Sequence, residues 1–178
     1  MIAPIRKFRS ILFAAALAVP GVAGAQNADS VKTATHGDWE VHCIKGTEAC
    51  AMQQVGKTSD GKRGLFVTIQ RVKPAKGQDG RTVSALISAI APLGVLIPYG
   101  LRAKTDGGAE TGMPYSRCLQ TGCFASSPMS DETVNRMKKG NVAAFSIALD
   151  REVTVNISLR GFTAAFNSLK PIAPGANQ

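Results

Sequence analysis

The residues best suited to chemistry lie in one short stretch, residues 36–52, which read HGDWEVHCIKGTEACAM. Histidines, carboxylates and cysteines this close fit a metal centre, a nucleophilic thiol with its base, or a hairpin closed by a disulfide. Zinc sites usually space their cysteines two to four residues apart, and only Cys118 and Cys123 come near that spacing. A catalytic thiol has to be free, and on a strand the neighbours His42 and Cys43 point to opposite faces. The pattern therefore favours the closed hairpin.

The chain has four cysteines, an even number that in an exported protein indicates two disulfides. Three pairings are possible. Six residues separate Cys43 from Cys50 and four separate Cys118 from Cys123, so each close pair can close a small loop across a hairpin turn. We expect the bonds Cys43–Cys50 and Cys118–Cys123, and neither a metal ion nor a cofactor.

Motifs for catalysis are scarce. The sequence holds no G-x-S-x-G, no H-E-x-x-H, no P-loop and no dinucleotide-binding glycine pattern. We therefore predict that the protein is not an enzyme. The alternative is a ligand-binding or hydrolytic site in loops at one end of the domain, near Asp38, His42 and Asp106, where converging acids would supply an acid and a base.

The amino-terminal residues have the build of a secretory signal peptide. Arg6, Lys7 and Arg9 precede an apolar run over residues 11–19, and a small-x-small exit ends at Ala25. The run is shorter than the roughly 20 residues that span a bilayer, so we predict cleavage after Ala25. Four regions follow: a cleaved signal peptide over residues 1–25, a flexible segment over 26–36, a single β-sandwich domain over 37–170, and a disordered tail over 171–178.

Alternation of apolar and polar residues predicts several short strands. The clearest cover residues 38–43 (DWEVHC), 64–72 (GLFVTIQRV), 82–91 (TVSALISAIA) and 152–160 (EVTVNISLR). The segment over 82–91 is more apolar than the others and suggests a central strand. With turn signals about every ten residues, these strands indicate an all-β protein, either a sandwich or a barrel.

Two segments break the strand pattern and predict short helices. In SDETVNRMKKG, residues 130–140, Ser130 is a good N-cap, acids fill the first turn and lysines precede a glycine. Further on, apolar side chains recur at helical spacing until Pro171 ends the pattern, and we expect them in the core: Phe162, Ala165, Phe166 and Leu169.

The charge balance bears on partners. Three of the 21 lysines and arginines lie in the predicted signal peptide, so 18 basic residues face 12 acidic ones afterwards, and the formal charge falls from +9 to +6. A basic surface favours anionic partners, including peripheral contact with an anionic membrane. Residues 57–81 are especially basic, although we prefer to interpret them as two solvated turns joined by a strand. Export and the shortage of interleaved aromatic residues argue against nucleic acid.

One apolar stretch, residues 91–101 (APLGVLIPYGL), does not fit a solvated turn. Its prolines indicate an edge strand or an extended crossing loop. We expect it to be mostly buried, and any exposed part is a candidate interaction patch. The patch residues are Pro92, Leu93, Val95, Leu96, Ile97, Pro98 and Tyr99.

Five blocks in order also carry a family resemblance: GDWEVHC, CAMQQ, PLGVLIPYGL followed by TDGG, YSRCLQTGCFA, and SLRGFTAAF. Together they reach from Gly37 to Phe166 and resemble the invasion-associated locus B family. The resemblance implies an exported bacterial protein with an immunoglobulin-like β-sandwich fold and disulfides at the four cysteines. It transfers no catalytic residues.

Two functions from different classes follow. The first is an exported interaction protein, periplasmic, secreted or at the outer surface, that binds a protein or an envelope component and contributes to envelope function or host-cell invasion. The second is a periplasmic ligand-binding or hydrolytic envelope protein. The sequence leaves the partner's identity and the oligomeric state open.

Overall fold

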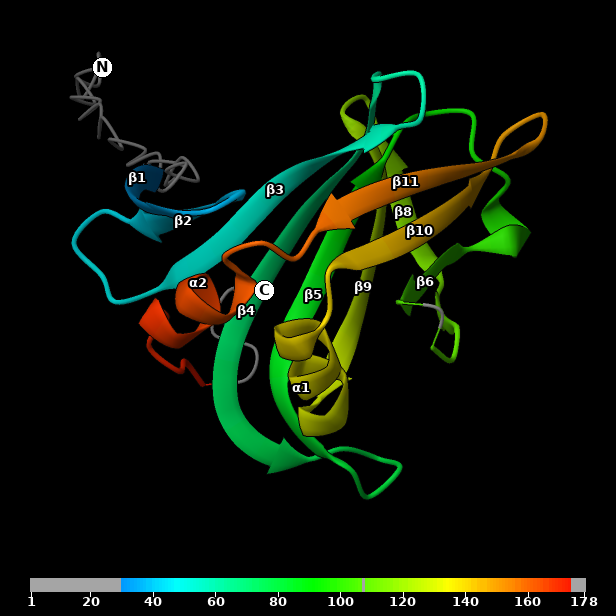
Figure 1. Ribbon diagram of the computed structural model, residues 1–178. Coiled ribbons are helices and arrows are strands. Elements are labelled where there is room, and N and C mark those ends of the chain that lie inside the picture. Colours follow the sequence, from blue (N-terminus) through cyan, green and yellow to red (C-terminus); the bar gives the residue numbers. More distant parts are fainter. Residues whose placement is uncertain (1–29, 107, 174–178) are drawn as a thin grey trace, which may run out of the picture.

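A computed structural model describes residues 30–106 and 108–173 of the chain. The predicted signal peptide lies outside these residues. The described part is one strongly curled antiparallel sheet with two short helices (Figure 1), which confirms the prediction of an all-β, sandwich-like fold. Its strands are β1 (Ser30–His36), β2 (Trp39–Ile44), β3 (Cys50–Thr58), β4 (Arg63–Lys76), β5 (Thr82–Ala91), β6 (Leu101–Thr105), β7 (Thr111–Met113), β8 (Tyr115–Leu119), β9 (Gly122–Ser130), β10 (Val142–Ala148) and β11 (Glu152–Ser158).

The strands follow the order β7-β6-β10-β11-β3-β4-β5-β9-β8, with β1 and β2 branching from β3. Strand β3 therefore has two partners on one edge. Its beginning pairs with β2, with Met52 opposite Val41, and its end pairs with β11, with Lys57 opposite Asn156. At the other end of the order β7 comes close to β9 without pairing, so the sheet is nearly closed.

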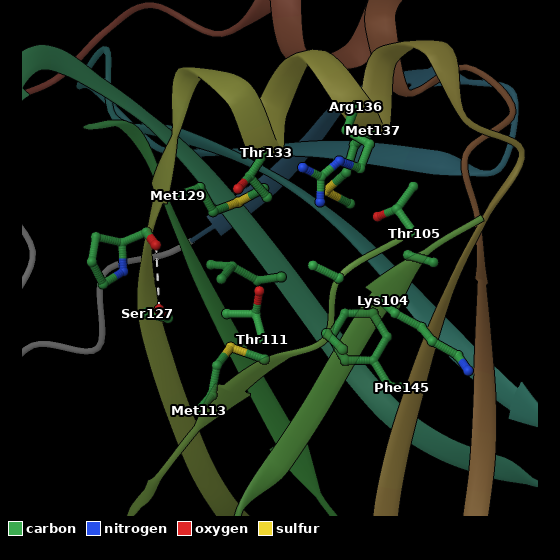
Figure 2. A pocket seen from close by; sticks show the side chains of 15 residues that line it. Lys104, Thr105, Thr111, Met113, Ser127, Met129, Thr133, Arg136, Met137 and Phe145 are labelled. Atoms are coloured by element: carbon green, nitrogen blue, oxygen red, sulfur yellow. Dashed lines mark hydrogen bonds between the residues drawn. The ribbon is translucent and has the colours of Figure 1, made fainter. Parts of the chain in front are cut away.

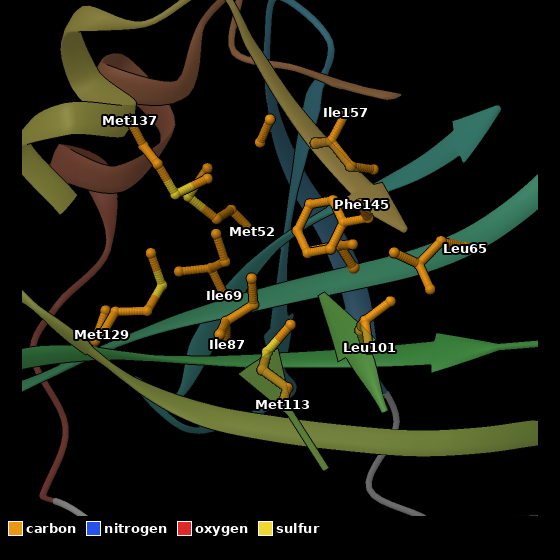
Figure 3. Packing of buried hydrophobic residues seen from close by; sticks show 14 of the residues in the cluster. Met52, Leu65, Ile69, Ile87, Leu101, Met113, Met129, Met137, Phe145 and Ile157 are labelled. Atoms are coloured by element: carbon orange, nitrogen blue, oxygen red, sulfur yellow. The ribbon is translucent and has the colours of Figure 1, made fainter. Parts of the chain in front are cut away.

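The core fills the inside of the curl (Figure 3). Alternate residues of each strand point inward, as the period of two requires. Trp39 is fully buried; its ring lies edge-on to the ring of Phe162, with the centroids 5.5 Å apart, and its indole N–H donates to the Ser158 carbonyl at 3.0 Å. Methionines fill much of the remaining space, where their flexible side chains suit irregular gaps: Met52, Met113, Met129 and Met137.

Both predicted helices are present, α1 (Asp131–Lys139) and α2 (Phe162–Ser168). The Ser130 hydroxyl accepts the Thr133 amide at 3.2 Å, as expected of an N-cap. Helix α1 closes one end of the sheet with Val134 and Met137, and α2 packs against β1 and β2. Within the described residues neither helix has the length and apolar character needed to cross a membrane.

Two boundary predictions were wrong. Residues 30–36 were assigned to a flexible segment but form β1, which pairs with β2 from Ser30 opposite Ile44 to His36 opposite Trp39. The strand SVKTATH is largely exposed, so it lacks the apolar alternation that marks a half-buried strand. At the other end, Ile172 was assigned to a disordered tail but bridges Val72 of β4, accepting the Lys73 amide at 2.8 Å. Residues 26–29 and 174–178 lie outside the described part.

Strand β5 is central, between β4 and β9, as predicted. The apolar sequence of β5 does not mean that both of its faces are fully buried. Ala85, Ile87 and Ala89 point into the core, whereas Leu86 and Ile90 are half-buried on the outer face. The outer face of this part of the sheet is therefore partly apolar.

Candidate functional site

The two cysteine pairs close two hairpins. Cys43 and Cys50 lie directly opposite each other on β2 and β3, and Cys118 and Cys123 on β8 and β9; in both pairs the Cα atoms are 4.0 Å apart and the sulfurs are bonded. No free cysteine remains in the described part, which holds all four. A thiol nucleophile is therefore unavailable at these positions, and each bond holds a short hairpin loop.

The apolar stretch after β5 is a loop containing one short helical turn, η1 (Ile97–Tyr99). The expectation that it is mostly buried was wrong: Leu93 and Leu96 are each 55% exposed and Ile97 is 48% exposed. Pro92 and Pro98 are exposed as well, and Tyr99 is half-buried. The loop joins β5 to β6 at the end of the molecule opposite α1 (Figure 1).

Several contacts fix the shape of this loop. Val95 is only 7% exposed and anchors the middle of the loop in the core. The Leu96 amide donates to the Ala148 carbonyl at 2.8 Å. Gly94 turns the chain with φ of +89°, a conformation that a side chain would strain. The backbone that carries the exposed leucines is therefore held in one conformation.

A fourth exposed apolar side chain lies at the same end. Leu119, 52% exposed, is opposite Gly122 in the hairpin of β8 and β9. Gly122 packs so closely on the Ala91 carbonyl that a Cβ atom there would lie 2.3 Å from its oxygen. This places the hairpin turn next to the start of the loop. We call the four exposed side chains at this end the apolar cap: Leu93, Leu96, Ile97 and Leu119.

The acids and histidine of the alternative site are only partly brought together. Asp38 and Glu40 line one groove where β2 and β11 diverge from β3, and the His42 ring lies 3.1 Å from the Glu40 carboxylate. Asp106 is not part of that groove; its carboxylate accepts the Asn141 amide at 2.8 Å and the Val142 amide at 3.1 Å. Asp106 thus fixes the turn before β10.

The two carboxylates in that groove are both held in their charged forms. The Arg160 guanidinium donates two hydrogen bonds to Asp38 and lowers the pKa of its carboxyl to about 2. A hydrogen bond from Lys32, with a second contact from His42, lowers the pKa of Glu40. A general acid needs a raised pKa, and neither carboxyl has one. Among the described residues, no three His, Cys, Asp or Glu side chains are grouped so that they could hold a metal ion.

A small, partly open pocket lies beneath α1, where β7 approaches β9 (Figure 2). Its volume is about 60 Å³, and Met113, Met129, Met137 and Phe145 line it together with threonines and Arg136. An engineered cavity that admits benzene is about 150 Å³. This space is smaller, and we attribute it to imperfect packing along the unpaired seam of the sheet.

The fold and the two closed hairpins define a small, disulfide-bonded all-β domain. The family model for invasion associated locus B (IalB) proteins matches residues 39–170. Invasion protein B homologs of Brucella abortus, strain 2308 and biovar 1 strain 9-941, are each 30% identical over 169 residues, covering 92% of this chain and 90% of theirs. The chain belongs to the invasion associated locus B family.

A solved structure shows the same fold. The crystal structure of invasion associated protein B from Bartonella henselae superposes with a TM-score of 0.59 at 20% identity, covering 76% of this chain and 94% of that one. At this identity the similarity concerns the fold alone.

Proposed function

We propose that this member of the invasion associated locus B family acts outside the cytoplasm as a non-enzymatic binding protein, and that the apolar cap is its binding surface for a partner protein of the cell envelope. The observation that carries the proposal is the exposure of Leu93, Leu96 and Ile97, each about half exposed, on a frame braced by Val95. Exposed apolar side chains this close together in one loop cost solubility unless a partner covers them, and a loop already held in one conformation lowers the ordering cost of binding.

Export is part of the proposal. The basic, apolar and small-residue pattern of residues 1–25 supports it, and the two disulfides are compatible with an oxidising compartment. Family membership supports a contribution to host-cell invasion. The periplasm is the compartment we propose, with secretion or attachment to the outer surface as a further step.

The test is photo-crosslinking in living cells at native expression. A photoreactive amino acid at position 96 should capture a discrete envelope protein, and the same probe at Asn135, exposed on α1 at the opposite end, should not. Replacing Leu93, Leu96 and Ile97 together with serine should abolish capture by a probe at position 119. Val31→Ser, which alters an apolar side chain 46% exposed on β1, is the matched control and should leave capture unchanged. Equal capture in both variants would refute the proposal.

A further inference from the structure

A second surface lies on the outer face of β3, β4, β5, β9 and β8, away from the apolar cap. One row of polar side chains crosses the strands in register, because Gln53 lies opposite Thr68, Thr68 opposite Ser88, and Ser88 opposite Ser126. Each of these residues has at least one buried neighbour in sequence, so their side chains point outward. The row presents an amide and three hydroxyls in a line.

A row of apolar side chains runs beside the polar one, again in register across the strands. It consists of Val55, Phe66, Ile90 and Phe124. Val55 is 40% exposed and the other three are half-buried. Arg117 of β8 ends the row, with its guanidinium 5.3 Å from the centre of the Phe124 ring.

Parts of both rows line an open groove of about 740 Å³. One side of the groove is formed by Ile172 and Ala173 of the carboxy-terminal segment, and the other side by Ser116 and Arg117 of β8. A groove of this size reaches the range of small-molecule sites, which is about 300–1,000 Å³. The groove is partly open to solvent, so a ligand that binds in it can extend beyond it.

Some polar groups of the groove are available for a ligand, although the Ser116 and Ser127 hydroxyls donate to the Phe124 and Pro128 carbonyls. Ser88 and Ser126 bond to each other at 3.0 Å, whereas the side chains of Thr68 and Gln70 form no hydrogen bond with the described residues. Arg117 forms no salt bridge with them either, and it is the only charged side chain among the described residues that line the groove. The groove therefore offers free donors and acceptors and one positive charge, with no acid to oppose an anion.

We propose that this groove binds an acidic polysaccharide. A sugar ring has an apolar face of C–H groups and a rim of hydroxyls, and it needs an apolar floor beside hydroxyl and amide groups. Phe124 and Ile90 supply the floor, and the unbonded side chains of Thr68 and Gln70 supply the polar contacts. Arg117 pairs with a sugar carboxylate, because a guanidinium binds carboxylates through charge-assisted hydrogen bonds. The apolar cap plays no part in this binding.

The test measures binding of polygalacturonate and of neutral dextran by isothermal titration calorimetry. We expect the wild-type protein to bind polygalacturonate at least tenfold more tightly than dextran. Arg117→Gln should weaken polygalacturonate binding by roughly tenfold to a hundredfold, because it removes a charge-assisted hydrogen bond to the sugar carboxylate. The double variant Thr68→Val, Gln70→Leu should weaken the binding of both polysaccharides, because it removes polar contacts that both use and leaves the charge of Arg117 in place.

Arg102→Gln is the matched control. Arg102 also lies over an aromatic ring, 4.3 Å from the centre of Tyr99, but it is outside the groove and should have no effect. If Arg102→Gln weakened polygalacturonate binding equally, the polyanion would be binding to positive charges in general, and the proposal would be overturned. The absence of polygalacturonate binding would overturn it as well.

Other ligands are outcomes of the same test. Arg117-dependent binding to vesicles of phosphatidylglycerol and phosphatidylcholine without polysaccharide binding would make the face a membrane surface. A wild-type dimer that Arg117→Gln dissociates would make it a self-association surface. The serine variants of the apolar cap should keep polysaccharide binding, so each proposal can fail alone.

Discussion

The side chain of Gln54 takes the place of a missing backbone pairing at the fork of β3. Its amide nitrogen donates to the Asp38 carbonyl at 3.0 Å and to the Ser158 carbonyl at 3.1 Å, and its oxygen accepts the Ser158 amide at 2.8 Å. It thereby ties β3 to the start of β2 and the end of β11. We predict that Gln54→Leu, which keeps the approximate volume and removes these bonds, destabilises the protein by about 2 kcal/mol.

The magnitude follows from what each partner loses. The Ser158 amide loses the acceptor that Gln54 supplies, and leaving a buried donor unpaired costs about 1–3 kcal/mol. The Ser158 carbonyl keeps the Trp39 indole N–H at 3.0 Å, so its loss is small. The site is half-buried, and water can partly replace the lost contacts to the Asp38 carbonyl. These considerations place the change near the middle of the range.

Urea unfolding without reductant, followed by fluorescence of the single tryptophan, measures the free energy of unfolding directly. The matched control is Gln53→Leu, because the neighbouring side chain points outward and forms no hydrogen bond with the described residues. We expect the control to change the stability by less than about 0.5 kcal/mol. If both variants unfold at the same urea concentration with the same slope, the fork is held by backbone pairing alone and the reasoning is refuted.

Three further predictions concern stability. Trp39→Ala should cost about 3–5 kcal/mol in urea unfolding, because a fully buried ring is removed from its contact with Phe162; a loss under about 1 kcal/mol would contradict this. Tyr115→Phe should raise the melting temperature, because the Tyr115 hydroxyl is buried without a partner among the described residues and burial raises its pKa to about 12; a lower melting temperature would reveal an unrecognised hydrogen bond. The lowered pKa of Asp38 stabilises the fold above pH 3.8, and this contribution should be lost as the pH falls toward about 2. The loss in the free energy of unfolding should be under about 1 kcal/mol, because the ion pair with Arg160 is solvent-exposed. Arg160→Gln should flatten the dependence of stability on pH in this window, and an unchanged dependence would exclude the ion pair as its cause.

Local signals in the sequence predicted several elements correctly. Ser130 marked the start of α1 because a hydroxyl before a helix satisfies a free amide, and this needs no knowledge of the rest of the fold. The phenylalanines of α2 indicated a buried face by their spacing, and Phe162 and Phe166 are both buried. Such signals depend on neighbours within one or two turns.

Other features depend on partners far along the chain. Strand β1 is stabilised by backbone pairing with β2, which its polar sequence does not reveal. Hydropathy predicted burial for Leu93 and Leu96, but Val95 alone reaches the core, since the loop crosses the end of the sheet. The two rows on the outer face arise from register between four strands. One sequence signal was available: Gln54 stands on the same phase as the buried Met52 and Gly56, where an apolar residue is expected.

The contact between Trp39 and Phe162 has a consequence for the order of assembly. The rings join positions 123 residues apart, and β3 gains its second partner, β11, only when residues near 156 are present. The cysteine hairpins, by contrast, need only a few consecutive residues. Contacts of such long range form slowly, and the chain leaves the ribosome amino terminus first. In a growing chain Trp39 would therefore lack its contact with Phe162 and be exposed to proteases and chaperones until α2 has been made. A chain shortened before α2 would leave Trp39 exposed.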